Sequence, residues 1–180
     1  MKTILHRIKE LVTFGPKRKK KIMETKCTAM QAAEELIRLA DIDSVSGGDL
    51  MTNLKLQKLL YYEQGFHLAT FGKPLFPEPV EAWIYGPAVP PVYEKYRPFG
   101  QNALPSPENG KEFPLKDAEL QLFNEVYETY KDYSAIGLMK MTHEESPWKK
   151  AAVHNRGAII STDEMKNFFK TKIEEQCIIF

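Results

Sequence analysis

The sequence predicts a mainly α protein: a compact domain of about six helices around a central hydrophobic helix, with a small β element of two or three strands. Apolar residues recur at helical spacing over most of the chain after residue 27. One of these segments, 54–71, is apolar on every side, which is typical of a helix enclosed by others. A short run around Trp83 is instead rich in alternating β-branched and aromatic residues.

The first helix of the domain is predicted over 29–40, where small and branched apolar residues recur at helical spacing. A loop containing two glycines is expected at 41–49. Thr52 or Asn53 can cap the central helix that follows, and Gly72 is well placed to end it.

Between residues 59 and 71 the central helix contains one charged residue, Glu63. A buried hydrogen-bonding group without a partner costs roughly 1–3 kcal/mol. We therefore expect the polar side chains of this helix to bond to neighbouring backbone or side chains. They are Gln57, Tyr61, Tyr62, Gln64 and His67.

A strand is predicted over 80–85, with Gly86 and Pro87 ending it. A short helix is expected to start at the prolines that follow, with Val92 and Tyr93 facing inward. The proline- and glycine-containing segment 98–114 is predicted to be an exposed loop.

The last third of the chain is predicted to be helical apart from one strand. A long helix is expected over 115–133, and Ser134 can cap a further helix through Met141. Ser146 and Pro147 are predicted to open a short turn containing Trp148. The run 158–160 is expected to pair with the strand near Trp83, and 161–164 reads as a capping box before the last helix.

Charge divides the chain into a basic N-terminal extension, 1–26, and a domain, 27–180. The extension has a net charge of +7 and the domain a net charge of −6. Within the extension, an apolar stripe at 4–12 can form a short amphipathic helix, and the basic run PKRKKK follows at 16–21. Three interpretations stay open: a solvated tail, a segment that docks on a partner, or an arm that contacts nucleic acid or anionic lipid.

The two cysteines, Cys27 and Cys177, are expected to be reduced thiols in a cytoplasmic protein. No apolar run approaches the roughly 18 residues that a membrane span needs. The extension does not resemble a signal peptide, because its short apolar patch precedes the basic cluster.

The sequence does not predict an enzyme or a cofactor. His67, His143 and Glu144 could form a metal or hydrolytic site only if the fold brought them together, and core or capping roles are the commoner alternative for histidines. No phosphate-binding loop, nucleophile motif or paired-histidine zinc motif occurs.

Aromatic residues around the predicted strand are the main candidates for binding a partner. Interface use of this region is predicted for Trp83, Tyr85, Gly86, Pro87, Tyr93, Lys95 and Tyr96. Core packing is the alternative for the aromatic rings, and a structural turn for Gly86 and Pro87. Nucleic acid is not expected to bind the domain, whose net charge of −6 repels phosphates, although the basic extension could contact it. Association into a homo-oligomer is left open.

Three blocks of the sequence, LKLQKLLYYEQGFHLATFGKPLF, EAWIYGPAVPPVY and THEESPWKKA, together resemble the Panacea domain of SocA-like antitoxins and phage-associated proteins, over about residues 28–170. Phe66, Glu63 and Pro91 depart from the family pattern, but they affect only the core and one helix start. The residues that carry the resemblance are Leu54, Leu56, Gln57, Lys58, Leu59, Leu60, Tyr61, Tyr62, Gln64, Gly65, His67, His143, Pro147 and Trp148.

This resemblance implies a non-enzymatic binding module: an antitoxin that neutralises a cognate toxin, encoded next to it, by direct protein contact. A proteolytic adaptor that delivers a toxin to a cellular protease is an alternative that the resemblance also allows. A histidine-dependent hydrolase or nuclease is a more remote alternative.

Overall fold

The computed structural model of the 180-residue chain describes residues 25, 27–45, 47–108, 112–154 and 157–175. The described residues form seven α-helices, one 3-10 turn and three short strands, so the mainly α prediction is confirmed. In chain order the elements are α2 Ala29–Ser44, α3 Asn53–Phe71, β1 Glu81–Trp83, β2 Gly86–Ala88, α4 Pro90–Tyr96, the 3-10 turn Arg97–Phe99, α5 Asp117–Tyr130, α6 Ala135–Glu144, α7 Ser146–His154, β3 Ala158–Ile159 and α8 Thr162–Glu175. The predictions for residues 1–24 and for Cys177 lie outside the described residues.

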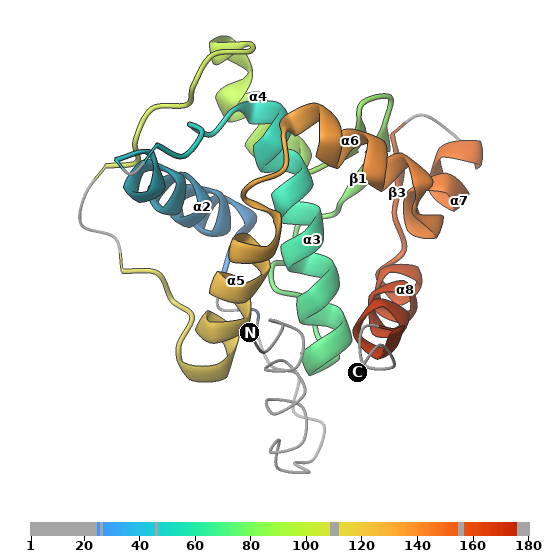
Figure 1. Cartoon of the computed structure of the whole chain (residues 1–180). Coiled ribbons are helices and arrows are strands. Elements are labelled where there is room, and N and C mark those ends of the chain that lie inside the picture. Colours follow the sequence, from blue (N-terminus) through green and yellow to red (C-terminus); the bar gives the residue numbers. More distant parts are fainter. Residues whose placement is uncertain (1–24, 26, 46, 109–111, 155–156, 176–180) are drawn as a thin grey trace.

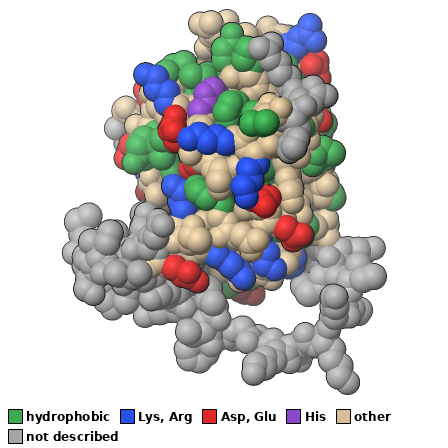
Figure 2. Space-filling view, turned by 90° about the vertical axis from the view of Figure 1, so that its right-hand side faces the viewer, with side chains coloured by type: hydrophobic (Ala, Val, Ile, Leu, Met, Phe, Trp, Pro, Cys, Tyr) green, Lys and Arg blue, Asp and Glu red, His purple; other side chains and the backbone are tan. Residues whose placement is uncertain are grey.

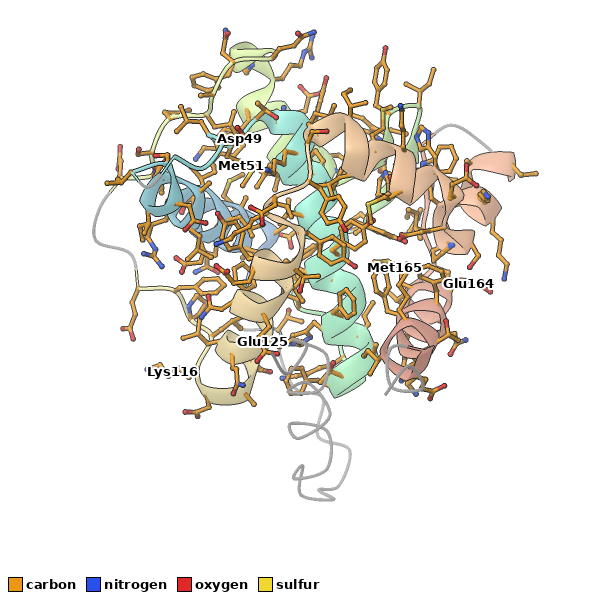
Figure 3. All side chains as sticks on the ribbon, in the orientation of Figure 1. Asp49, Met51, Lys116, Glu125, Glu164 and Met165 are labelled. Carbon is orange, nitrogen blue, oxygen red and sulfur yellow. The ribbon has the colours of Figure 1, made fainter. Side chains whose placement is uncertain are left out.

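Helix α3 is the centre of the fold, as the sequence predicts. In Figure 1 it runs through the middle of the molecule, with α2 and α5 on one side and α6, α7 and α8 on the other. Leu59, Leu60, Tyr61 and Tyr62 have no exposed surface. Side chains from the surrounding helices, such as Met165 of α8, point towards α3, whereas Lys116 and Glu164 lie on the outside (Figure 3).

Aromatic rings fill the space between α3, α5 and α8. Tyr62 stacks on Tyr130 with a centroid separation of 3.9 Å, and Phe66 meets Phe169 edge-on at 4.9 Å. Gly65 lies directly against one of these rings: a Cβ atom there would come within 2.1 Å of the Phe169 ring. Gly65 therefore permits the close approach of α3 and α8.

Side chains cap the first two described helices, and the caps of α3 are those that the sequence predicts. Thr28 forms a capping box with Gln31 at the start of α2, and the Thr52 side chain accepts from the Lys55 backbone at the start of α3. Gly72 ends α3 in the left-handed conformation, with φ of 72°.

Replacing Thr28 by Ala should lower the free energy of unfolding by about 1 kcal/mol, because the backbone N–H of Gln31 loses its side-chain acceptor. Urea denaturation monitored by circular dichroism measures the change. Thr171→Ala is the matched control, because its exposed hydroxyl bonds only to a carbonyl within its own helix. Equal losses in the two variants would show that the cap does not contribute.

The small sheet has the strand order β2-β1-β3, and both pairings are antiparallel. The predicted pairing of the 158–160 run with the strand near Trp83 is confirmed, with Ala82 opposite Ala158. The prediction that Gly86 and Pro87 end the strand is wrong, because these residues form β2 and pair with Trp83 and Ala82. The turn lies at Ile84 and Tyr85 instead. Proline is accepted in β2 because this strand is at the edge of the sheet.

Several predicted helix ends move by a few residues. Helix α2 continues to Ser44, into the predicted loop, and α6 continues to Glu144 rather than Met141. Helix α5 is shorter than its predicted range, and the turn at Trp148 is the full helix α7. The 98–114 loop is mostly exposed among its described residues, but Leu104 is buried and its N–H donates to the carbonyl of Met51.

Candidate partner-binding site

Polar side chains of α3 hold the backbone of the segment that follows β1. The Gln57 side chain accepts from the Val89 N–H at 2.8 Å, and Lys58 Nζ donates to the Pro87 carbonyl at 2.8 Å. Asn53 Nδ2 donates to the Tyr93 carbonyl at 3.2 Å. The central helix thus positions β2 and the start of α4 through three side chains on one of its faces.

The side chains of Gln64, His67 and Tyr62 also have partners, as predicted. Gln64 bonds to the backbone of Leu75 and Phe76, and His67 Nδ1 lies 2.9 Å from the Lys73 carbonyl oxygen. The Tyr62 hydroxyl donates to Glu145 Oε1 at 3.2 Å, whereas the buried Tyr61 hydroxyl makes no hydrogen bond within the described residues, contrary to the prediction.

Glu63, like Tyr61 and Thr70, has a buried oxygen without a hydrogen-bond partner among the described residues. It is buried, and desolvation raises the pKa of its carboxyl well above the usual value. Burial therefore favours its protonated, uncharged form. This explains how a helix without a solvent face tolerates an acid.

Gly86 lies directly over the end of the Lys58 side chain. Its φ of +94° is unfavourable for residues with a side chain, and a Cβ there would come within 2.8 Å of Thr142 Oγ1 and 2.9 Å of Lys58 Cε. Glycine is therefore required for β2 to pack on α3 and α6.

The side-chain nitrogen of Lys58 is enclosed beneath Gly86 of β2. The residue is 1% exposed, and desolvation lowers its pKa to about 7. The pKa of nearby His143 is also lowered, first by partial desolvation and then by the charge of Lys58. Both shifts favour neutral side chains in this part of the core.

Aromatic groups connect this core to the surface of the sheet. The His143 ring stacks on Trp148 at 4.1 Å, and Trp148 Nε1 donates to the Trp83 carbonyl at 3.1 Å. Trp83 packs edge-on against Tyr93 at 4.8 Å, and its Nε1 donates to Glu81 Oε2 at 2.8 Å. These contacts fix the Trp83 indole in one orientation.

The outer side of the sheet leaves apolar groups in solvent. Because Glu81 pairs with Ile159, these side chains and that of Trp83 lie on one face of the sheet, while Ala82 faces the core. Ile159, Ile84 and Tyr85 are 65%, 54% and 65% exposed. We call Glu81, Trp83, Ile84, Tyr85 and Ile159 the hairpin surface.

Charges elsewhere on the same side of the molecule are mixed. Figure 2, which views the molecule from the right-hand side of Figure 1, shows Lys and Arg side chains interspersed with Asp and Glu between apolar groups. This face therefore has no extended field of one sign to attract a nucleic acid.

The structure divides the predicted partner-binding residues into three groups. Tyr85 and Lys95 are exposed, and Trp83 and Tyr93 are half-buried. Gly86, Pro87 and Tyr96 are buried, whereas the predicted partner-binding role would need them at the surface. Lys95 faces α2, where Nζ is 3.6 Å from Glu34.

Ile84 and Ile159 are the candidates that sequence reasoning missed. The predicted pairing of the 158–160 run with the strand near Trp83 could have pointed to Ile159. When only one face of a sheet packs on the core, every second residue of its strands faces solvent. The predicted strand 80–85 includes Ile84 and assigns it no exposed position. Its position at the turn became evident only with β2.

The two histidines considered for catalysis have separate surroundings. His67 lies beside Lys73 and Glu119, with Nε2 3.6 Å from Glu119 Oε1, and the pKa of Glu119 is lowered to about 2, first by the nearby His67 and also by Lys73. His143 instead stacks on Trp148. Within the described ranges, no group of three or more His, Cys, Asp or Glu side chains could hold a metal ion. Within the same ranges, no helix has the length and apolar character needed to cross a membrane.

Comparison with known proteins identifies the family of the chain. A 60-residue stretch is 40% identical to antitoxin SocA of Caulobacter vibrioides (strain NA1000 / CB15N), covering 33% of this chain and 32% of that protein. The match thus spans about a third of the curated relative. No solved structure matches the chain. Residues 56–149, just over half of the chain, match the family described as antitoxin SocA-like, Panacea domain. The chain belongs to this family of SocA-like Panacea domains.

Proposed function

We propose that this protein is an antitoxin that neutralises a cognate toxin by direct protein–protein contact, and that the hairpin surface is part of the contact. Membership of the SocA-like family supports the antitoxin role. The observation that carries the choice of surface is the exposure of Ile84, Tyr85 and Ile159 around the orientated indole of Trp83.

The aromatic content and the prior order of the hairpin surface favour it as a binding site. Tyr and Trp side chains are enriched among residues that dominate binding energy, since they bury large areas and lose few rotamers. Trp83 is held by Glu81, Tyr93 and the Trp148 contact before any partner arrives. A surface that is already ordered loses less entropy on binding.

The test starts from the reading frames that flank the gene. Each is expressed from an inducible promoter in a host without this protein, and one that arrests growth is taken as the toxin. Co-expression of the antitoxin should restore growth, and the two purified proteins should form a complex. If no flanking frame is toxic, or if this protein rescues none, the proposed role is rejected.

Tyr85→Ala combined with Ile159→Asp should weaken toxin binding by tenfold or more, because it removes one aromatic anchor and places a charge in an apolar contact. Isothermal titration calorimetry with the purified toxin measures the dissociation constant. Tyr133→Ala is the matched control, since Tyr133 is also a half-exposed tyrosine (45%) but lies outside the hairpin surface. Unchanged affinity in the double variant would place the interface elsewhere.

The same strains separate neutralisation from delivery to a protease. Under direct neutralisation, the toxin persists at its usual level in a complex with the antitoxin. Under delivery, toxin abundance falls after co-expression and recovers in a protease-deficient host. Immunoblotting of the toxin after translation is blocked distinguishes the two.

A further inference from the structure

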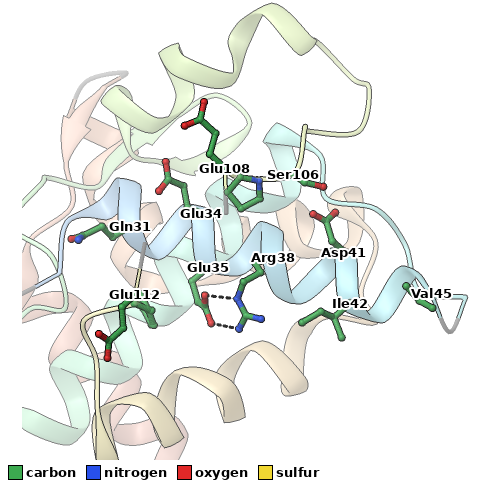
Figure 4. Close-up of a pocket in the computed structure, with 12 residues that line it drawn as sticks. Gln31, Glu34, Glu35, Arg38, Asp41, Ile42, Val45, Ser106, Glu108 and Glu112 are labelled. Atoms are coloured by element: carbon green, nitrogen blue, oxygen red, sulfur yellow. Dashed lines mark hydrogen bonds and ion pairs between the residues drawn. The ribbon is translucent and has the colours of Figure 1, made fainter. Parts of the chain in front are cut away.

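A groove runs along the exposed side of α2, away from the hairpin surface. Its volume is about 440 Å³. One wall is a single face of α2 from Gln31 to Val45, and the other is formed by the described residues 106–108 and 112–113 (Figure 4). At 1.5 Å per residue, the α2 wall is roughly 21 Å long.

The groove is acidic over most of its length. Five carboxylates line it, from Glu34, Glu35, Asp41, Glu108 and Glu112, against the single guanidinium of Arg38. Arg38 is already paired with Glu35. At the rim, Lys95 lies 3.6 Å from Glu34 and Lys116 lies 3.5 Å from Glu112, but these lysines are 52% and 72% exposed and such pairs are weak.

The end of the groove at the C-terminus of α2 is apolar. Ile42 and Val45, which line it, are 54% and 88% exposed. The groove therefore changes along α2 from acidic, near Glu34 and Glu35, to apolar, near Ile42 and Val45. Its ligand should have the complementary order of basic and apolar groups.

We infer that the groove binds the basic N-terminal extension of the same chain, running antiparallel to α2. Read backwards from Thr28, the sequence first presents the basic run 17–21 and then the apolar stripe 4–12. An antiparallel extension would place these lysines and the arginine against the acidic half of the groove. The apolar stripe would then reach Ile42 and Val45.

Charge and connectivity both favour this occupant. The extension carries a net charge of +7, opposite to that of the groove, and it is joined directly to the helix that forms the wall. From Thr28 to Glu35 the helix rises only about 10 Å. From Thr28 back to Lys21 an extended chain can span roughly 23 Å, so the basic run can turn and reach the carboxylates. The covalent link also gives the extension an effective concentration in the millimolar range.

Trypsin digestion of the full-length protein tests the inference, with cleavage within 17–21 followed by mass spectrometry. The groove variant combines Glu34→Gln, Asp41→Asn and Glu108→Gln, none of which adds a trypsin site. At low salt, cleavage of the extension should be at least tenfold faster in this variant than in the wild type. Raising the salt concentration should remove the difference, because the attraction is screened.

The matched control combines Glu144→Gln, Asp163→Asn and Glu174→Gln, which are exposed acids outside the groove. It should be cleaved at the wild-type rate. Equal rates in all three proteins would overturn the inference. Protection that increases with protein concentration would also overturn it, by identifying the occupant as the extension of a second copy. A zero-length carboxyl–amine crosslink from 17–21 to Glu34 or Glu108 within monomeric protein is the positive result expected.

Discussion

Replacing Gly65 by Ala should lower the free energy of unfolding by about 3 kcal/mol, although alanine is the better helix former by roughly 1 kcal/mol. The added methyl group would sit 2.1 Å from a ring carbon of Phe169, far inside van der Waals contact. Phe169 has no exposed surface and contacts Tyr61 and Phe66, so its ring has no free space into which to rotate. Helices α3 and α8 would have to separate, and urea denaturation measures the loss.

Gly137→Ala is the control for this prediction. Gly137 is also helical, but the nearest atom to its Cβ position is a side-chain oxygen of Ser134 at 3.2 Å, so this change should cost less than about 1 kcal/mol. A double-mutant cycle with Phe169→Leu adds a direct test of the contact. The cost of Gly65→Ala should fall by more than 1 kcal/mol in that background. Additive costs would show that the clash is not with Phe169.

The central helix is the part of the fold that the sequence predicts best. A helix from Leu54 to Phe71 that is apolar on all sides is stable only when other elements enclose it. Its buried polar side chains must then find hydrogen-bond partners on those elements. Gln57 and Gln64 do so through backbone groups of the segments that follow α3. Gly65 was identified within the motif, but its packing role could not be predicted, because the ring that requires it is about a hundred residues away in sequence.

The candidate site could be predicted only in part. The aromatic residues near Trp83 were predicted as candidates because strand-like composition and a cluster of aromatic residues are local signals in the sequence. The hairpin was misassigned because glycine and proline usually end strands, whereas here α3 and α6 hold Gly86 and Pro87 in an edge strand. That arrangement buries the two residues and moves the exposed turn to Ile84 and Tyr85. Burial of Tyr96 likewise depends on tertiary packing that a seven-residue helix does not reveal.

Lys58 leads to the second large effect, a dependence of stability on pH. Its pKa is about 7 in the folded protein and 10.5 in the absence of burial. Between these values the unfolded chain binds more protons than the folded one, so the contribution of Lys58 to stability rises as the pH rises. The cost of burying the charge is therefore full below pH 7 and disappears above about pH 10.5.

Replacing Lys58 by Met should relieve this cost while keeping the length of the side chain. The stability of Lys58→Met relative to wild type should consequently fall by about 3 kcal/mol between pH 7.5 and pH 10, because in this range the folded wild-type lysine is mostly neutral while the unfolded one is still mostly protonated. Below pH 7.5 the comparison would include His143, whose pKa also responds to Lys58, so the measurement is made above it. Urea denaturation of both proteins at several pH values gives the difference, in which the other titrating groups largely cancel.

Lys140→Met is the control, because Lys140 is exposed. Its stability relative to wild type should stay constant over the same pH range. At pH 10 the Lys58 variant should be no more stable than wild type, since the neutral amine can still donate to the Pro87 carbonyl, a bond that methionine cannot form. If the relative stability of Lys58→Met does not change with pH, the lysine keeps its proton in the folded protein. The pairing of β2 with α3 would then depend on a buried charge rather than on a neutral hydrogen bond.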